Sequence, residues 1–143
     1  MGQTTITITV HTVNLSSGSS TPVCCTISQI GGILIPDPND PPNPELAVSE
    51  VYKGDNIIWS GIAHDGVTII NITASCNLPN YFGMQLHGYP PGGGSIVTRA
   101  AEHLMDNPLP YTIYFNIEGI DEQFNLDPKI WIKPPPVNPS SGV

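Results

Sequence analysis

Proline and glycine break this chain into short segments, and this punctuation restricts the folds that the chain can form. The 143 residues include 16 prolines and 14 glycines, and five of the prolines fall within residues 36–44. Proline interrupts helices and central strands because it lacks a backbone N–H, and glycine accepts the positive φ angles of tight turns. Turn signals recur about every eight to twelve residues, a spacing that is typical of all-β sandwiches.

The segments between these breaks alternate between apolar and polar side chains. Residues 4–13 place Ile6, Ile8 and Val10 on one face and threonines on the other, and residues 111–117 alternate in the same way. This period of two predicts strands with one buried face. Further strands are predicted at 23–27, 30–35, 46–52, 57–59, 67–73, 80–84 and 124–132.

The predicted fold is a single-domain antiparallel β-sandwich over residues 1–133. In it, 111–117 and 124–132 form the last hairpin, because only a short turn separates them. Residues 96–105 are the one segment whose composition predicts a helix, of about two turns. Residues 134–143 are rich in proline, serine and glycine, and predict a tail outside the domain.

The charge balance argues against two classes of partner. Four lysine and arginine residues face twelve acids, which gives a formal charge of −8. Such a surface repels nucleic acids and anionic membranes, so neither is expected as a partner. No apolar run approaches the roughly 20 residues that a membrane-spanning helix needs.

The amino-terminal segment and the cysteines together predict a cytoplasmic protein. The segment MGQTTITITV lacks the basic and apolar regions of a secretory signal. The three cysteines, Cys24, Cys25 and Cys76, are an odd number, and two of them are adjacent. Adjacent cysteines rarely pair with each other, so reduced thiols are expected.

The dipeptide Asp127-Pro128 interrupts the last predicted strand and offers a candidate reaction. An aspartate carboxylate can attack its own backbone carbonyl, and the proline nitrogen is then the leaving group. Glu118, Asp121 and Glu122 lie in the preceding turn, and one of them could move the proton or activate water. The structural alternative is that Asp127-Pro128 is an ordinary strand start, where proline is tolerated.

Two segments near the carboxyl terminus carry a resemblance to known families. YTIYF at 111–115 and FNLDPKI at 124–130 resemble the carboxyl end of the DP-EP family, which are small bacterial β-sandwich proteins. This resemblance implies self-cleavage at Asp127-Pro128. The chemistry of the bond adds that Lys53 or Lys129 could capture the anhydride instead, and that the last strand would be retained if Ile130 and Ile132 are buried. The aromatic strand followed by Asp-Pro-x-Ile is also similar to the end of PixA/AidA-like inclusion-body proteins.

A metal centre or cofactor is not expected. Residues 51–69 resemble a strand pair of the cupredoxins, and His64, Cys76, Met84 and His87 supply the donor types of blue copper. Their order is wrong, however, because cupredoxins place cysteine, histidine and methionine close together near the carboxyl terminus. The glycines and the tryptophan of this stretch are more simply a turn and a core residue.

A third interpretation is a self-assembling or partner-binding β-sandwich without catalysis. Only 11% of the residues are charged, and the predicted strands carry threonine faces. Residues 4–13 are expected to act as an edge strand that recruits another strand, because they contain neither lysine nor proline. The prolines at 134–136 could dock on a neighbouring subunit as polyproline II. A homo-oligomer is therefore expected under this interpretation.

Overall fold

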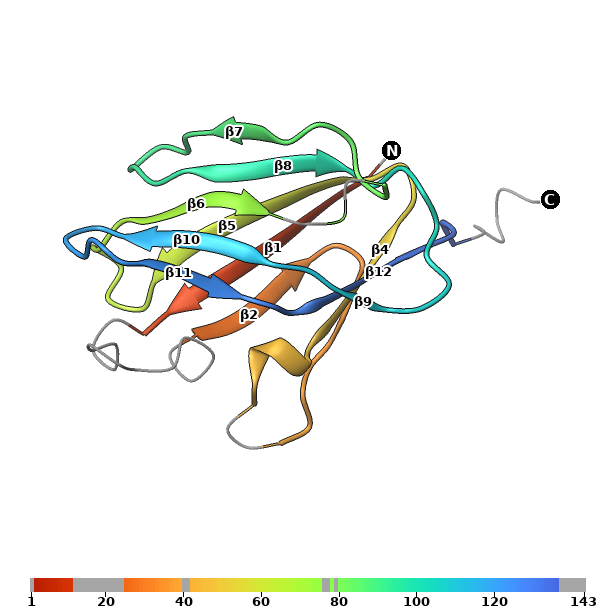
Figure 1. Ribbon diagram of the computed structural model, residues 1–143, viewed down its shortest axis with the longest axis horizontal. Coiled ribbons are helices and arrows are strands. Elements are labelled where there is room, and N and C mark those ends of the chain that lie inside the picture. Colours follow the sequence, from red (N-terminus) through yellow and green to blue (C-terminus); the bar gives the residue numbers. More distant parts are fainter. Residues whose placement is uncertain (1, 12–24, 40–41, 76–77, 79, 137–143) are drawn as a thin grey trace.

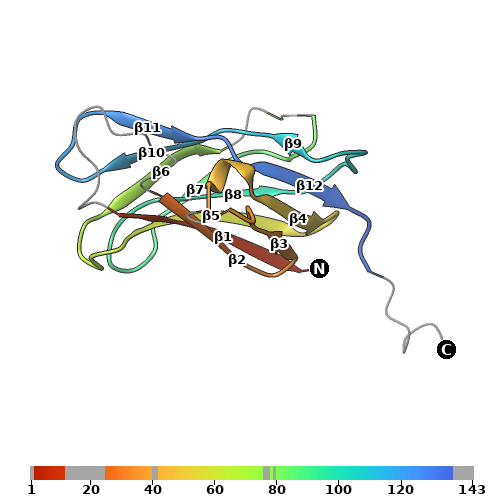
Figure 2. The same cartoon turned by 90° about the horizontal axis from the view of Figure 1, so that it is seen from below.

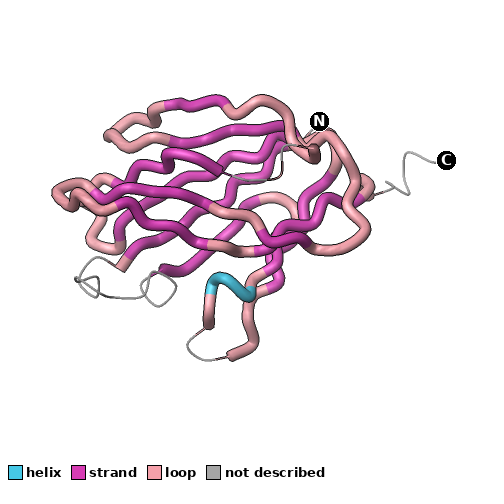
Figure 3. The backbone as a smooth tube through the Cα atoms, viewed as in Figure 1, coloured by secondary structure: helices cyan, strands magenta, loops and turns pink. Residues whose placement is uncertain are grey.

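The computed structural model describes residues 2–11, 25–39, 42–75, 78 and 80–136, and within them the protein is all-β (Figure 1). The predicted fold class is confirmed. The strands are β1 (Gln3–Val10), β2 (Cys25–Ile30), β3 (Ile33–Ile35), β4 (Val48–Tyr52), β5 (Asn56–Ala63), β6 (Ile70–Ser75), β7 (Leu86–Gly88), β8 (Ile96–Ala100), β9 (Leu109–Pro110), β10 (Ile113–Ile117), β11 (Gln123–Leu126) and β12 (Lys129–Lys133). A single 3₁₀ turn, η3 (Pro44–Leu46), is the helical element of the described chain (Figure 3).

The strands form three sheets that together make a sandwich. The five-stranded sheet has the order β2-β1-β5-β8-β7, and the three-stranded sheet β11-β10-β6 lies over it. The four-stranded sheet β3-β4-β12-β9 lies at one end, where Figure 2 shows β12 continuing from the upper layer and β3 and β4 from the lower one. The pairs β1–β5 and β4–β12 are parallel, whereas the other named pairs are antiparallel.

The core lies between the five-stranded and three-stranded sheets. Trp59 of β5 and Tyr111, just before β10, are 0% and 1% exposed. The Trp59 indole N–H donates a hydrogen bond of 2.9 Å to the Tyr111 hydroxyl oxygen, so one buried polar contact joins the two layers. Phe82 meets the Trp59 ring edge-on at 5.8 Å. This arrangement satisfies the indole N–H, which is costly to bury alone.

The predicted helix at 96–105 is wrong. Residues 96–100 form β8, which pairs with β5 on one side and β7 on the other. Its side chains alternate between buried and half-buried, and Val97 is 0% exposed. The β-branched residues Ile96, Val97 and Thr98 suit such a strand, because their χ1 angles are restricted in a helix. Pairing with two neighbouring strands therefore outweighs the weak helical spacing of the apolar residues in this segment.

Two further strand predictions need correction. Residues 80–84 form a turn and an isolated bridge from Phe82 to Ala101, and the strand begins only at Leu86. Residues 4–13 were expected at a sheet edge, but β1 lies between β2 and β5 in the middle of the five-stranded sheet. The apolar alternation predicts the buried face of β1 correctly, but alternation alone does not show how many neighbouring strands a strand has.

The last predicted hairpin is correct in its first half only. Strand β11 pairs with β10, from Ile113↔Leu126 to Asn116↔Gln123. Strand β12 leaves this sheet and pairs with β4 and β9 instead. The change of sheet occurs at Asp127-Pro128. Strand β12 ends at Lys133, and residues 134–136 are exposed. No helix among the described residues has the length and apolar character needed to cross a membrane.

The buried Trp59–Tyr111 hydrogen bond predicts a specific loss of stability. Replacing Tyr111 with phenylalanine keeps the ring and leaves the indole N–H without this acceptor. We expect Tyr111→Phe to lower the free energy of unfolding by about 1–3 kcal/mol, measured by chemical denaturation. Tyr114→Phe is the matched control, because Tyr114 is 36% exposed. Equal effects of the two variants would show that the buried hydrogen bond contributes nothing special.

Candidate functional site

The Asp127-Pro128 junction is held by backbone contacts on both sides. The Asp127 N–H donates to the Glu45 carboxylate at 2.8 Å, and the Pro128 carbonyl accepts from the Tyr111 N–H at 3.0 Å. The next N–H, of Lys129, donates to the Ala47 carbonyl at 3.1 Å. Asp127 is exposed and Pro128 is buried. The junction is therefore a fixed crossing between two sheets.

Proline fits this crossing without disturbing a sheet. Pro128 lies between the end of β11 and the start of β12, so its missing N–H costs no ladder hydrogen bond. Its carbonyl is still used, by Tyr111. Pro128 therefore suits the change of direction between the two sheets, whether or not the Asp127-Pro128 bond is cleaved.

The three carboxylates predicted to assist the reaction lie elsewhere. Glu118, Asp121 and Glu122 are exposed residues in and beside the β10–β11 turn. Because Gln123 is the first residue of β11, the strand carries the chain roughly 14 Å from this turn to Asp127. The Glu118 carboxylate instead accepts from the Ile69 N–H at 3.4 Å. The structure does not bring these three side chains to the bond.

The carboxylate that does reach the junction is Glu45, which the sequence analysis missed. It lies 82 residues before Asp127 in the chain, within η3. The parallel pairing of β4 with β12 brings the two together, because η3 immediately precedes β4. The local signal in the sequence is only the cap, in which the Asn43 side chain accepts from the Glu45 N–H at 3.0 Å. Nothing in that signal indicates the distant partner.

The two lysines proposed as acceptors lie at opposite ends of β12. Lys129 directly follows Pro128, whereas Lys53 meets the other end of β12, where its N–H donates to the Lys133 carbonyl at 3.0 Å. Only Lys129 is therefore close to the junction in the fold. Its register partner is Val48 of β4.

Asp37 anchors the proline-rich loop that leads to Glu45. Its carboxylate accepts hydrogen bonds from the Asn43 N–H at 2.8 Å and from the Asn39 N–H and side-chain amide at 3.2 and 2.8 Å. The Asn43 N–H, followed by the Asn39 contacts, lowers the pKa of Asp37 below its usual value, although burial opposes this shift. The ionised carboxylate therefore holds this segment in shape.

The described residues among the copper donor types considered above lie in separate surroundings. The His64 ring is tilted against that of His11 with centroids 4.6 Å apart, His87 Nε2 lies 2.8 Å from the Thr73 carbonyl oxygen, and Met84 is 80% exposed. Cys76 and Cys24 lie outside the described residues, and Cys25 is buried in the core. Within the described ranges, no three histidine, cysteine or acidic side chains are grouped as metal ligands.

A second candidate site is the outer face of the five-stranded sheet, the side turned away from the core. The strand registers define its members. In β1, β5 and β8 they alternate with buried residues, and those of β2 and β7 are aligned with them across the sheet. They are Thr26, Ser28 and Ile30 of β2, Gln3, Thr5, Thr7 and Thr9 of β1, Asn56, Ile58, Ser60 and Ile62 of β5, Ile96, Thr98 and Ala100 of β8, and Leu86 and Gly88 of β7. None of these side chains is charged.

The edges of this sheet carry exposed apolar side chains. Strands β2 and β7 are its outermost strands, and neither contains lysine or proline. Ile30 of β2 is 79% exposed and Leu86 of β7 is 57% exposed. Proteins normally blunt such edges with charges, prolines or bulges, because an unpaired strand is a template for another chain. The exposed part of each edge is short, because the proline-rich loop lies beside Thr26 and Ile27 of β2 and because β7 has only three residues.

Comparison with known proteins identifies a shared fold. No protein-family model matches the chain, and no curated protein matches it by sequence. The crystal structure of an inclusion body protein, PixA, from Burkholderia cenocepacia is similar, with a TM-score of 0.58 over 93% of this chain and 97% of that chain. The two sequences are 7% identical, so the similarity is one of fold.

The Asp37 contacts predict a pH-dependent contribution to stability. Since the folded pKa lies below that of the unfolded chain, this contribution is present above the unfolded value near pH 4 and is lost as the pH falls through the folded pKa. We expect Asp37→Asn to be less stable than the natural sequence at pH 7, with a difference that shrinks in acid. Denaturation curves from pH 7 to pH 2 measure this difference, and a pH-independent difference would contradict the assignment.

Proposed function

We propose that the protein is a structural β-sandwich that associates with copies of itself through the outer face of the five-stranded sheet. The observation that carries this proposal is the absence of charge from that described face in a chain of formal charge −8. The edges of the same sheet supply additional exposed apolar side chains. The proposal corresponds to the non-catalytic interpretation of the sequence.

The absence of charge lowers the cost of burying this face. Burying an ionised side chain without a partner is strongly unfavourable, whereas threonine and isoleucine carry no such penalty. Hydroxyl groups on the face can satisfy one another, as the Thr7 and Ser60 oxygens do at 3.0 Å. Two such faces can therefore meet without desolvating any of the acids.

The structural neighbour is compatible with this function. The neighbour is an inclusion body protein. At 7% identity the neighbour supports the fold, and the assembly role is our proposal for this chain. The cytoplasmic location predicted from the sequence would suit such a role, and it remains a prediction.

Self-cleavage at Asp127-Pro128, as the DP-EP resemblance implies, is a second candidate. One observation favours it: Asp127 is exposed and its N–H is held 2.8 Å from the Glu45 carboxylate. In this reaction the Asp127 carboxylate attacks its own carbonyl carbon, the Pro128 nitrogen leaves with a proton, and water opens the resulting anhydride. The released segment would stay in place, since Ile130 and Ile132 are both 0% exposed.

Self-association is tested by placing a charge at the centre of the outer face. Thr5 lies between Ile30 and Ile58 in the register, and we expect Thr5→Lys to weaken association by roughly tenfold or more, because an ammonium group must be desolvated. Sedimentation velocity over a concentration series measures this. Asn125→Lys adds the same charge to the exposed side of β11 and is the matched control. A concentration-independent monomer in the natural sequence would refute the proposal.

The two candidate functions are separated by the intact mass of the denatured protein, followed over days at neutral pH. Self-association alone predicts one species of 15.3 kDa. Self-cleavage predicts two fragments, ending at Asp127 and starting at Pro128, whose masses sum to the chain plus one water. In that case Asp127→Ala should stay whole, and Glu45→Gln should be cut more slowly if Glu45 assists.

A further inference from the structure

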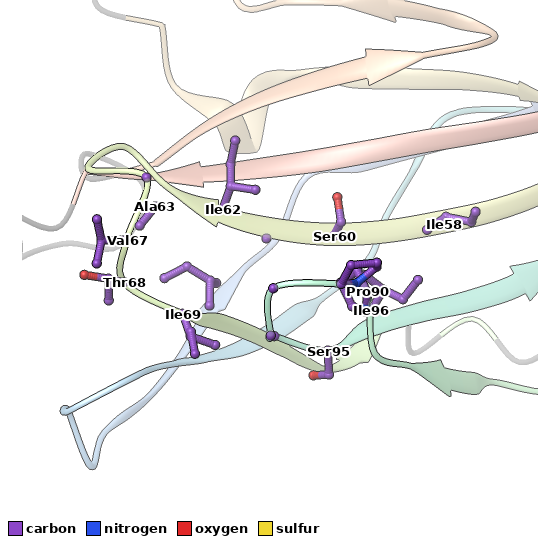
Figure 4. A pocket seen from close by; sticks show the side chains of 17 residues that line it. Ile58, Ser60, Ile62, Ala63, Val67, Thr68, Ile69, Pro90, Ser95 and Ile96 are labelled. Atoms are coloured by element: carbon purple, nitrogen blue, oxygen red, sulfur yellow. The ribbon is translucent and has the colours of Figure 1, made fainter.

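A notch interrupts the five-stranded sheet beside the second half of β5. The pairing of β5 with β8 ends at Trp59↔Val97, although β5 continues to Ala63. The segment that leads into β8 turns away from β5. Its Ser95 carbonyl accepts a hydrogen bond of 3.1 Å from the Ile72 N–H of β6, in the three-stranded sheet. Within the described part of the chain, no strand pairs with residues 60–63 on this side (Figure 4).

The backbone of β5 directs hydrogen-bonding groups into this notch. The N–H groups of Asn56 and His64 donate to the Gly2 and Val10 carbonyls, on the β1 side. Successive residues of a strand point their backbone groups to opposite sides. The N–H and carbonyl of Gly61 and the N–H of Ala63 therefore point away from β1. These are the groups with which a further strand would pair.

The notch has the size and chemistry of a binding site for an uncharged ligand. Its volume is about 650 Å³, within the range of ligand pockets, and none of its lining residues is charged. Ile58, Ile62 and Ser60 line one side, and Ile69, Pro90 and Ile96 line the other, as Figure 4 shows. A charged group would lose its hydration here without meeting an opposite charge.

The three glycines at 92–94 keep the far wall of the notch thin. All three have positive φ angles, of 92°, 96° and 82°. A Cβ at Gly94 would lie 2.9 Å from the Ile70 carbonyl oxygen, and one at Gly93 would lie 3.0 Å from Ile69 Cδ1. The loop can therefore pack directly on β6 only because it has no side chains there. This close packing leaves the space beside β5 open.

We propose that the notch binds an uncharged, extended peptide segment, which adds to β5 as a strand next to Gly61 and Ala63. The backbone groups of β5 provide the pairing, and the isoleucines provide apolar contacts for alternate side chains of the segment. The absence of charge from the lining selects against segments that contain lysine, arginine, aspartate or glutamate. This site shares Ile58, Ser60, Ile62 and Ile96 with the outer face, but it goes beyond the self-association proposed above, because a peptide can occupy it on a single copy of the protein.

The test uses a capped tetrapeptide, acetyl-Thr-Ile-Thr-Val-amide, as the probe. Amide hydrogen exchange, followed by NMR on the full chain, reports each backbone group separately. At saturating peptide we expect exchange of the Gly61 N–H to slow at least tenfold. The same peptide with aspartate in place of isoleucine should give no protection. Peptide-induced shifts without protection of Gly61 would overturn strand addition, and so would the absence of any saturable change.

A matched pair of variants separates this site from the rest of the outer face. Ile62 lines the notch and is 52% exposed, whereas Ile30 lies on the same sheet at β2, away from the notch, and is 79% exposed. Ile62→Glu should weaken peptide binding at least tenfold, while Ile30→Glu should change it less than twofold. Equal effects would overturn the proposal. Loss of self-association in both variants with this difference retained would show that the two proposals stand separately.

Discussion

The parallel register between β1 and β5 is the constraint on which the rest of the molecule depends. It runs without a break from Gln3↔Asn56 to Val10↔Ala63 and aligns Ile6 with Trp59. Because side chains alternate along a strand, a slip of one residue would turn the buried set toward solvent. This register therefore determines which side chains fill the core and which form the uncharged outer face. It also determines which side chains of β5 lie beyond the end of its pairing with β8.

The second constraint is the change of sheet at Asp127-Pro128. A chain that leaves one layer for another must end one hydrogen-bond ladder before starting the next, and proline is compatible with that break. The contacts of Glu45, Ala47 and Tyr111 fix the crossing from two other parts of the chain, the segment around η3 and the residues just before β10. The feature that suggested chemistry in the sequence thus has a structural role that it fulfils whether or not the bond is cut.

The sequence predicted well what depends on neighbouring residues and poorly what depends on distant ones. The alternation of β1 and β10 was visible because each strand buries one face. The position of β1 inside the sheet, the approach of Glu45 to Asp127 and the pairing of β8 all depend on long-range partners. The helix predicted at 96–105 failed for the same reason, since two neighbouring strands determine its backbone.

The distribution of charge connects the fold to the proposed assembly. Among the acids that the structure describes, only Glu50 lies within a strand, and its carboxylate pairs with the Lys133 ammonium group at 3.3 Å. The other described acids lie in turns, loops, η3 and the junction at Asp127. Repulsion between copies therefore acts mainly where strand ends approach one another, and it is screened beyond about 8 Å at physiological salt. Such a pattern disfavours contacts through the loops and leaves uncharged sheet faces, among them the outer face of the five-stranded sheet, as surfaces on which two copies can meet.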